Sequence, residues 1–185
     1  MARVRDPEGK RAALLAAGLR LAGQGLQGWS ISTITAEAGV AKGTFYVHFA
    51  GRAEYLLALH QLFHERIISG MGEAVGDQPP GRSALLAGAL AYLDGCLNER
   101  AVKSLLLEAR IEPLIQAEIA ARNEMTAVLT EPHFAAMGWR EPRTCARLFI
   151  ALVAEAALLE LPAGVPDPRV RRAVAEFLDR TVGRT

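Results

Sequence analysis

The sequence predicts an all-α protein, from its composition and from the spacing of its apolar residues. Hydrophobic residues, mostly the strong helix formers Ala and Leu, make up 51% of the 185 residues, whereas aromatic residues make up 6%. Apolar residues recur with helical spacing in about nine segments that Gly and Pro separate. Such a chain buries roughly 70% of its unfolded surface, which is enough for a substantial core. We expect two domains, residues 1–52 and 53–185.

Charge is distributed unevenly along the chain. The formal net charge is +1, but residues 1–66 hold eight basic and five acidic side chains, a net charge of +3. The remaining residues hold 13 basic and 15 acidic side chains, a net charge of −2. A mildly basic N-terminal end beside a nearly neutral body fits a nucleic-acid-binding domain on a helical body. The alternative is that the asymmetry arises by chance.

Cysteine usage and hydropathy indicate a soluble protein of the reducing cytoplasm. Cys96 and Cys145 lack metal-ligand spacing and lie in Ala- and Leu-rich helical pattern, so we expect buried free thiols. The N-terminus is charged and no apolar run leads to a cleavage site, so we expect no signal peptide. The richest apolar run, residues 148–161, contains Glu155 and Glu160 and is too short to span a bilayer, so no membrane partner is expected.

The N-terminal end is expected to form three helices. Asp6-Pro7-Glu8 is typical of a helix start, and the first helix is predicted to end near residue 22. Ser30 fits the N-cap of a second helix over residues 31–38. Gly39 follows as the residue that suits a left-handed turn.

The third helix, residues 41–48, has the properties of a helix that enters the major groove of DNA. It is too short to be stable alone, so Val40, Phe45 and Phe49 must pack it against its neighbours. Its first turn, residues 42–44, combines small residues and donors with free backbone N–H groups and the positive end of the helix dipole.

Two kinds of DNA contact are expected from this region. Groups that would touch base edges are Lys42, Gly43, Thr44 and Val47, the last through apolar contact alone. Groups that would touch the phosphate backbone are Ser30 or Ser32, Tyr46, His48 and Arg52. Each residue alone fits an ordinary exposed position, whereas the whole constellation points to DNA. Ala41 is a poor N-cap for the third helix.

These residues resemble the TetR (tetracycline-repressor) family. The family pattern Ile-Ala-x-x-Ala-Gly-Val-Ser-Lys-Gly-Thr-Leu-Tyr-x-His-Phe is similar to residues 34–49, which the basic Arg52 follows. The similarity extends over roughly residues 10–60. The positions that depart from the pattern are Arg20, Thr35, Ala41 and Phe45.

The resemblance implies a helix-turn-helix head on a helical body of a homodimer. It implies groove contacts from residues 42–44 and phosphate contacts among Thr44, Tyr46, His48 and Arg52. It also implies a small-molecule pocket in the C-terminal body. Most members of the family repress transcription and release DNA when an effector binds.

Six further helices are expected in the body. The expected ranges are about 51–75, 83–98, 102–111, 114–130, 142–161 and 168–182. An irregular segment after residue 130 is expected to hold Pro132, His133, Phe134 and Trp139.

The helix over residues 142–161 is apolar on nearly every face, so it must be covered on both sides. A two-fold interface in which this helix and the next, residues 168–182, meet their copies would cover it. The alternative is a helix that is buried inside one subunit.

Candidate ligand-binding residues are polar or aromatic side chains in the apolar body. They are Tyr92, Cys96, Glu108, Arg110, Gln116, Asn123, Met125, Trp139 and Glu155. Each also fits an ordinary exposed or paired residue, and the surrounding Ala and Leu favour a largely apolar effector. Glu155, an acid within an apolar helix, needs a partner, either an arginine across the dimer or a cationic ligand.

No catalytic constellation is found in the sequence. It has no Gly-rich phosphate loop, nucleophile elbow or paired-carboxylate motif, so neither enzymatic activity nor a cofactor is expected. His60 and His64 stand four residues apart, but two histidines do not make a metal site, and an exposed helix face explains them.

The sequence therefore predicts a ligand-responsive DNA-binding transcriptional regulator. Repression is the expected mode, with a small-molecule effector that releases the protein from a palindromic operator. The alternative is a helical small-molecule-binding protein or enzyme with a vestigial DNA-binding head.

Overall fold

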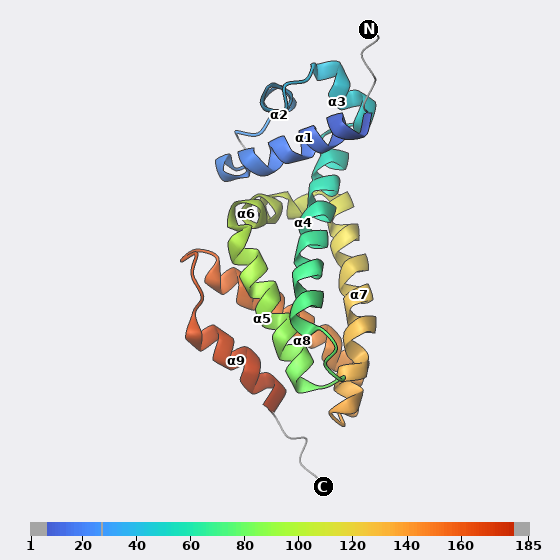
Figure 1. Ribbon diagram of the computed structural model, residues 1–185, viewed down its shortest axis with the longest axis vertical. Coiled ribbons are helices and arrows are strands. Elements are labelled where there is room, and N and C mark those ends of the chain that lie inside the picture. The colour runs from blue at the N-terminus through green and yellow to red at the C-terminus, as the bar shows by residue number, and fades with distance from the viewer. Residues whose placement is uncertain (1–6, 27, 180–185) are drawn as a thin grey trace. The chain divides into compact units, whose positions relative to one another are not determined.

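The computed structural model of the protein describes residues 7–26 and 28–179, and the regular structure in these ranges is helical. In chain order the α-helices are α1 (Pro7–Leu21), α2 (Ile31–Glu37), α3 (Lys42–His48), α4 (Arg52–Val75), α5 (Arg82–Asn98), α6 (Arg100–Glu108), α7 (Pro113–Ala136), α8 (Pro142–Glu160) and α9 (Pro168–Asp179) (Figure 1). Two 3₁₀ turns, η1 (Ala22–Gln24) and η2 (Ala109–Ile111), follow α1 and α6. The all-α prediction is confirmed.

The predicted irregular segment after residue 130 is wrong, because α7 continues through Pro132 to Ala136. A proline so close to the end of a helix removes one hydrogen bond, and Pro132 is exposed. Phe134 offsets that cost by its complete burial, with its ring edge-on to Trp139 and Phe149 at centroid distances of 5.4 and 5.7 Å. The predicted end of the last helix, residues 180–182, lies outside the described residues.

The chain forms two compact units. The first consists of the described part of Met1–Phe63 together with Ala101–Glu118, and the second of His64–Arg100 with the described part of Ile119–Thr185. Helices α4 and α7 contribute residues to both units. A boundary at residue 52 between a DNA-binding and an effector-binding domain stays a prediction about function.

Four buried aromatic rings form the core of the first unit. Tyr55 lies at the centre, with centroid distances of 5.2 Å to Trp29, 5.2 Å to Phe45 and 4.9 Å to Phe49. Its hydroxyl donates a hydrogen bond of 2.6 Å to the Leu14 carbonyl of α1. These contacts hold α3, which is too short to be stable alone, against α1 and the start of α4.

Gly18 lets α1 approach this aromatic core closely. A Cβ atom at this position would collide with the Tyr55 hydroxyl and would lie 2.9 Å from a methyl group of Leu59. A side chain here would therefore displace the ring that holds α1 and α4 together.

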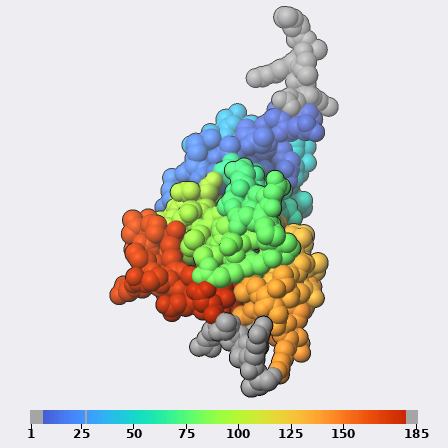
Figure 2. Space-filling model, turned by 60° about the horizontal axis from the view of Figure 1, so that its bottom comes forward, coloured from blue at the N-terminus to red at the C-terminus, as the bar shows by residue number. Residues whose placement is uncertain are grey.

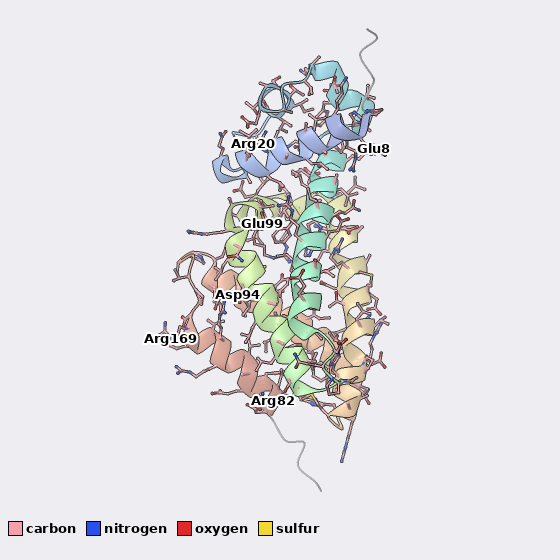
Figure 3. The ribbon with its side chains drawn as sticks, in the orientation of Figure 1. Glu8, Arg20, Arg82, Asp94, Glu99 and Arg169 are labelled. Atoms are coloured by element: carbon pink, nitrogen blue, oxygen red, sulfur yellow. The ribbon has the colours of Figure 1, made fainter. Side chains whose placement is uncertain are left out.

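Helices α5, α8 and α9 pack against one another in the second unit. Their buried apolar residues include Leu93, Cys96, Phe149, Val153, Val174 and Leu178. Two ion pairs join α5 to α9: Arg82 binds Asp179, and Arg171 binds Asp94 at 2.7 Å. Figure 3 labels the two α5 partners, Arg82 and Asp94. Figure 2 shows α9, in red, at the surface of this unit.

Candidate nucleic-acid interface and effector site

Helix α2 begins with a reciprocal cap. The Ser30 hydroxyl oxygen accepts a hydrogen bond of 3.0 Å from the Thr33 N–H, and the Ser30 N–H donates one of 2.9 Å to the Thr33 hydroxyl. Thr33 here takes the place that Glu or Gln holds in a standard capping box. The capping role of Thr33 was not predicted, although a Ser-x-x-Thr spacing at the start of a helix is consistent with it.

The turn between α2 and α3 has the geometry of a Schellman motif. Gly39 has a φ of +67°, which favours glycine, and its N–H donates to the Ala36 carbonyl at 3.1 Å. The Val40 N–H donates to the Thr35 carbonyl at 3.0 Å. Thr35 departs from the family pattern, but its buried hydroxyl is satisfied by the Ile31 carbonyl at 2.9 Å. The predicted turn at Gly39 is confirmed.

Helix α3 divides sharply into a buried and an exposed side. Phe45 is completely buried, whereas Tyr46 and Val47 are 53% and 77% exposed. Lys42 and Gly43 are also exposed, and Thr44 and His48 are half-buried. The small, donor-bearing first turn is therefore open to solvent, as a helix that approaches base edges requires. Ala41, at the N-cap, provides no side-chain hydrogen bond to this turn, as predicted.

Two arginines of the first unit make hydrogen bonds that the sequence did not reveal. Arg20, which stands where the family pattern is apolar, pairs with Glu37 at 2.6 Å and so links α1 to α2 (Figure 3). The Arg52 guanidinium donates to the Leu26 carbonyl at 3.1 Å. Arg52 is thus held at the first residue of α4 while its side chain stays exposed.

All the predicted DNA-contacting residues lie in the first unit, between the start of α2 and the start of α4. The exposed ones are Ser30, Ser32, Lys42, Gly43, Tyr46, Val47 and Arg52. Ser30 also serves as the cap of α2, which leaves its hydroxyl less free for a phosphate than the sequence suggests. The DNA contacts themselves stay predictions.

Two short helices joined by a glycine turn, a buried aromatic core and an exposed third helix are the features of a helix-turn-helix, and the comparisons with known proteins agree. Residues 14–59 match the model of the family described as bacterial regulatory proteins, tetR family. No curated protein matched the chain. Residues 14–59 are thus similar to this family, and the whole chain shares the fold of solved TetR-family transcription regulators.

Solved structures share the fold over nearly the whole chain. A transcriptional regulator from Rhodococcus sp. Rha1 has a TM-score of 0.76 and 22% identity, and the match covers 96% of both chains. A TetR-like transcriptional regulator from Rhodococcus sp. RHA1 has a TM-score of 0.74 and 15% identity, with 95% of this chain and 97% of that chain covered. The multidrug binding protein EbrR, in complex with imidazole, has a TM-score of 0.71 and 21% identity, with 95% and 98% covered.

The predicted ligand-binding residues divide between the two units. Glu108, Arg110 and Gln116 belong to the first unit, and all three are exposed. In the second unit Asn123, Met125 and Glu155 are exposed, whereas Tyr92, Cys96 and Trp139 are half-buried or buried. Trp139 packs against the rings of Phe134 and Phe177, and the assignment of all nine residues to a ligand site stays a prediction.

The buried acid of α8 is Glu160 rather than Glu155. Glu155 lies on the exposed side of the helix, so the expectation that it needs a partner is wrong. Glu160 is 1% exposed, and its carboxylate accepts hydrogen bonds from Arg171 at 2.9 and 3.2 Å. The Asp167 N–H donates a further bond of 2.9 Å. The partner comes from α9 of the same subunit, which an eleven-residue separation in sequence could not indicate.

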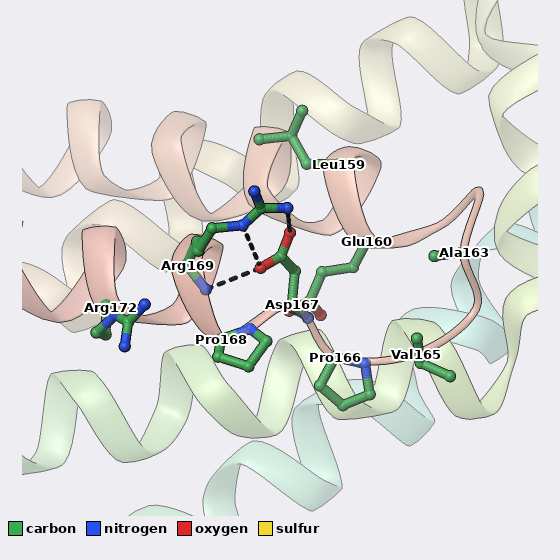
Figure 4. A pocket seen from close by; sticks show the side chains of 9 residues that line it. All are labelled: Leu159, Glu160, Ala163, Val165, Pro166, Asp167, Pro168, Arg169 and Arg172. Carbon is green, nitrogen blue, oxygen red and sulfur yellow. Dashed lines mark hydrogen bonds and ion pairs between the residues drawn. The ribbon is translucent and has the colours of Figure 1, made fainter.

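An open hollow of about 470 Å³ lies beside this ion pair, where α8 passes into α9 (Figure 4). Leu159, Ala163 and Val165 form part of its apolar lining, and Arg172 is one of its basic residues. Asp167 in the lining accepts a hydrogen bond of 2.8 Å from the Arg169 N–H. Arg169 also holds the pKa of the Asp167 carboxyl below its ordinary value. A smaller hollow of about 240 Å³ includes Asn123.

The burial of Cys96, Cys145 and His60 can be compared with what the sequence predicted for them. Cys96 is buried, as expected, whereas Cys145 is half-buried, and its burial raises the pKa of the thiol. His60 is 3% exposed, so the interpretation of its position as an exposed helix face is wrong. Within residues 7–26 and 28–179, no group of three or more potential ligands could hold a metal ion. No helix in these ranges is long and apolar enough to cross a membrane.

Proposed function

We propose that the protein is a dimeric repressor that leaves a palindromic operator when a small-molecule effector binds. The observation that carries the proposal is the division of α3, where Phe45 is completely buried and Val47 is 77% exposed. Helix α3 has seven residues and is fixed in place by aromatic packing. Its first turn can therefore contact base edges in the DNA major groove without being reordered. Lys42, Gly43, Thr44 and Val47 read base edges, and the flanking groups bind phosphates.

Dimerisation through α8 and α9 has support in the exposed apolar residues of α8. Leu148 and Leu159 are 60% and 61% exposed. The exposed Ala151 and Glu155 and the half-buried Leu152 lie between them at helical spacing. A contact between two copies of α8 would remove these leucines from water. The two α3 helices of the dimer then fit half-sites about 34 Å apart, one turn of DNA.

The small-molecule response has weaker support than DNA binding does. EbrR, which shares the fold, is a multidrug binding protein that was solved with imidazole. Of the nine candidate residues, Tyr92 and Cys96 on α5 and Trp139 after α7 are the ones that are half-buried or buried. An effector acts as a switch only if it binds the released state more tightly than the DNA-bound state.

Salt dependence of binding to a selected duplex tests the proposal. DNA enriched from a random pool by the full-length protein should bind with an affinity that falls by orders of magnitude between about 50 and 200 mM salt. A thermal-shift screen of apolar and aromatic compounds should then raise the melting temperature, and the compounds found should release the duplex. An intact protein without selective DNA binding at low salt would instead support a helical binding protein with a vestigial head.

A further inference from the structure

The backbone of Leu26 is held from two sides within the first unit. Its N–H donates a hydrogen bond of 2.9 Å to the Glu108 carboxylate, and its carbonyl accepts one of 3.1 Å from the Arg52 guanidinium. Leu26 lies between η1 and α2, Glu108 is the last residue of α6, and Arg52 is the first residue of α4. Three segments that are distant in sequence therefore meet at the polar groups of one residue.

The chain next to Leu26 is shaped to admit the Glu108 carboxylate. Gly25 has a φ of +66°, and a Cβ atom at this position would lie 3.3 Å from a carboxylate oxygen of Glu108. A larger residue would strain the backbone and crowd the acceptor.

The position of Glu108 at the C-terminal end of α6 explains why its carboxylate needs a hydrogen-bond donor. A negative charge at the C-terminal end of a helix lies beside the negative end of the helix dipole, which is unfavourable. The Leu26 N–H offsets this by supplying a donor to the carboxylate. A carboxylate that sits against its own helix dipole and reaches a donor 82 residues away in sequence makes a specific tether.

We propose that Glu108 is a positioning residue for DNA binding that acts through Leu26 on Arg52. By fixing the Leu26 backbone, Glu108 fixes the carbonyl that orients the Arg52 guanidinium. One N–H of that guanidinium is occupied by Leu26, and its remaining donors stay available for a phosphate oxygen. This inference rests on the proposed DNA-binding role of Arg52.

Whether DNA binding becomes weaker or stronger when the Glu108 carboxylate is removed distinguishes a positioning role from simple charge repulsion. Removal of a carboxylate from a DNA-binding surface should strengthen DNA binding through reduced repulsion. Loss of the tether should weaken it, because Arg52 must then be ordered when DNA binds. Glu108→Ala and Glu8→Ala, which changes an exposed carboxylate of α1 in the same unit, remove the same charge and form a matched pair.

The experiment measures the affinity of the full-length variants for the enriched duplex and for a random duplex. Glu108→Ala should weaken both by about threefold to tenfold, which is the factor for one net hydrogen bond. Glu108→Gln should retain most of the affinity, because its amide oxygen still accepts from the Leu26 N–H. Glu8→Ala should leave affinity unchanged or raise it.

A double-mutant cycle with Arg52→Ala identifies the path. If Glu108 acts through Arg52, the Glu108→Ala substitution should have no further effect in the Arg52→Ala protein. Both single variants should also lower the salt slope, by about one phosphate contact. Circular dichroism of each variant verifies the fold.

The outcomes distinguish this inference from the function on which it rests. Absence of selective binding by the wild-type protein overturns the proposed function and this inference with it. Selective wild-type binding, with Glu108→Ala equal to or tighter than wild type, overturns the inference alone. Additive effects of Glu108→Ala and Arg52→Ala, or no rescue by Glu108→Gln, also overturn it while the proposed function stands.

Discussion

On α3, single residues that are two positions apart have opposite environments. Phe45 is completely buried among aromatic rings, and Val47 is more than three-quarters exposed. Because each turn of a helix takes 3.6 residues, one face can be fixed by packing while the other stays free to contact a partner. The exposed residues can therefore be substituted without loss of the fold, which makes their roles in binding testable.

The first prediction at this scale separates base contacts from phosphate contacts. Arg52→Ala and Tyr46→Phe should weaken binding to selected and random DNA alike, because phosphates carry no sequence. Lys42→Ala and Thr44→Ala should also lower the ratio between the two affinities, by about 1–3 kcal/mol for each lost base contact. Fluorescence anisotropy with both duplexes measures the ratio. An equal loss on both duplexes for all four variants would contradict the division.

The second prediction concerns Tyr55 and alkaline pH. Burial raises the pKa of the Tyr55 phenol above its ordinary value of 10.0. Because the folded-state pKa lies above the unfolded one, the stabilisation is fully present below about pH 10 and is lost as the pH rises further. In urea unfolding, Tyr55→Phe should cost about 1 kcal/mol at neutral pH. It should also show a smaller decline above pH 10, and an identical decline in both proteins would refute this.

The elements show how short helices are supplemented by specific side chains. Helix α2 has the Ser30–Thr33 cap. Helix α3, of the same length, has Ala41 at its N-cap position without a side-chain hydrogen bond and depends on packing. In the second unit, Glu160 and Arg171 join the end of α8 to α9 across the connection between them. Local capping and buried pairing thus set the ends of these helices.

The third prediction is that Ala41→Ser stabilises the protein. Ala41 has the extended backbone of an N-cap, with φ −70° and ψ 148°, so a serine hydroxyl could reach the first-turn N–H groups. The expected gain in the free energy of unfolding is about 1 kcal/mol. Ala36→Ser, within α2 and exposed, is the control and should give no gain. Equal gains from the two substitutions would refute a capping effect.

The fourth prediction concerns the buried ion pair. Arg171→Ala leaves the Glu160 carboxylate buried without its cation and should lower the free energy of unfolding by about 3 kcal/mol. Arg169→Ala, which removes the arginine paired with Asp167 at 3.1 Å on the surface, should change it little. Chemical denaturation compares the two. A similar small effect of both substitutions would show that Glu160 finds another partner.

For the whole molecule, α8 offers one surface with exposed leucines, Leu148 and Leu159. Exposed leucines at this spacing would cost solubility in a monomer, and a second copy would bury them. Helix α7 also exposes apolar residues, Met125, Val128 and Leu129. The two helices therefore offer rival surfaces for self-association, and a direct comparison decides between them.

The fifth prediction is that Leu148→Glu produces monomers while Leu129→Glu does not. The two leucines are similarly exposed, at 60% and 65%, so neither substitution should harm the fold of the subunit. A glutamate in a two-fold interface meets its own copy, and the buried like charges oppose association. Sedimentation velocity measures the oligomeric state. Monomers from Leu129→Glu alone would move the interface to α7.

The sequence by itself determined the features that depend on neighbouring residues. The helices and the turn at Gly39 follow from spacing and backbone preference, and the alternation of Phe45 and Val47 follows from helical periodicity. These features need contacts only within a few residues, so they can be predicted one segment at a time. The end of α7 was misjudged because Pro132 is a strong local signal and the burial of Phe134 is a tertiary one.

Only the tertiary structure decided which polar groups are partners. Tyr55 binds Leu14, Glu108 binds Leu26, and Glu160 binds Arg171, across 41, 82 and 11 residues of sequence. Glu155 and Glu160 both lie in the same apolar run, and their local sequence gave no reason to choose between them. The packing of α9 determines that Glu160 is the buried acid, because a buried carboxylate is stable only where the folded chain brings hydrogen-bond donors to it.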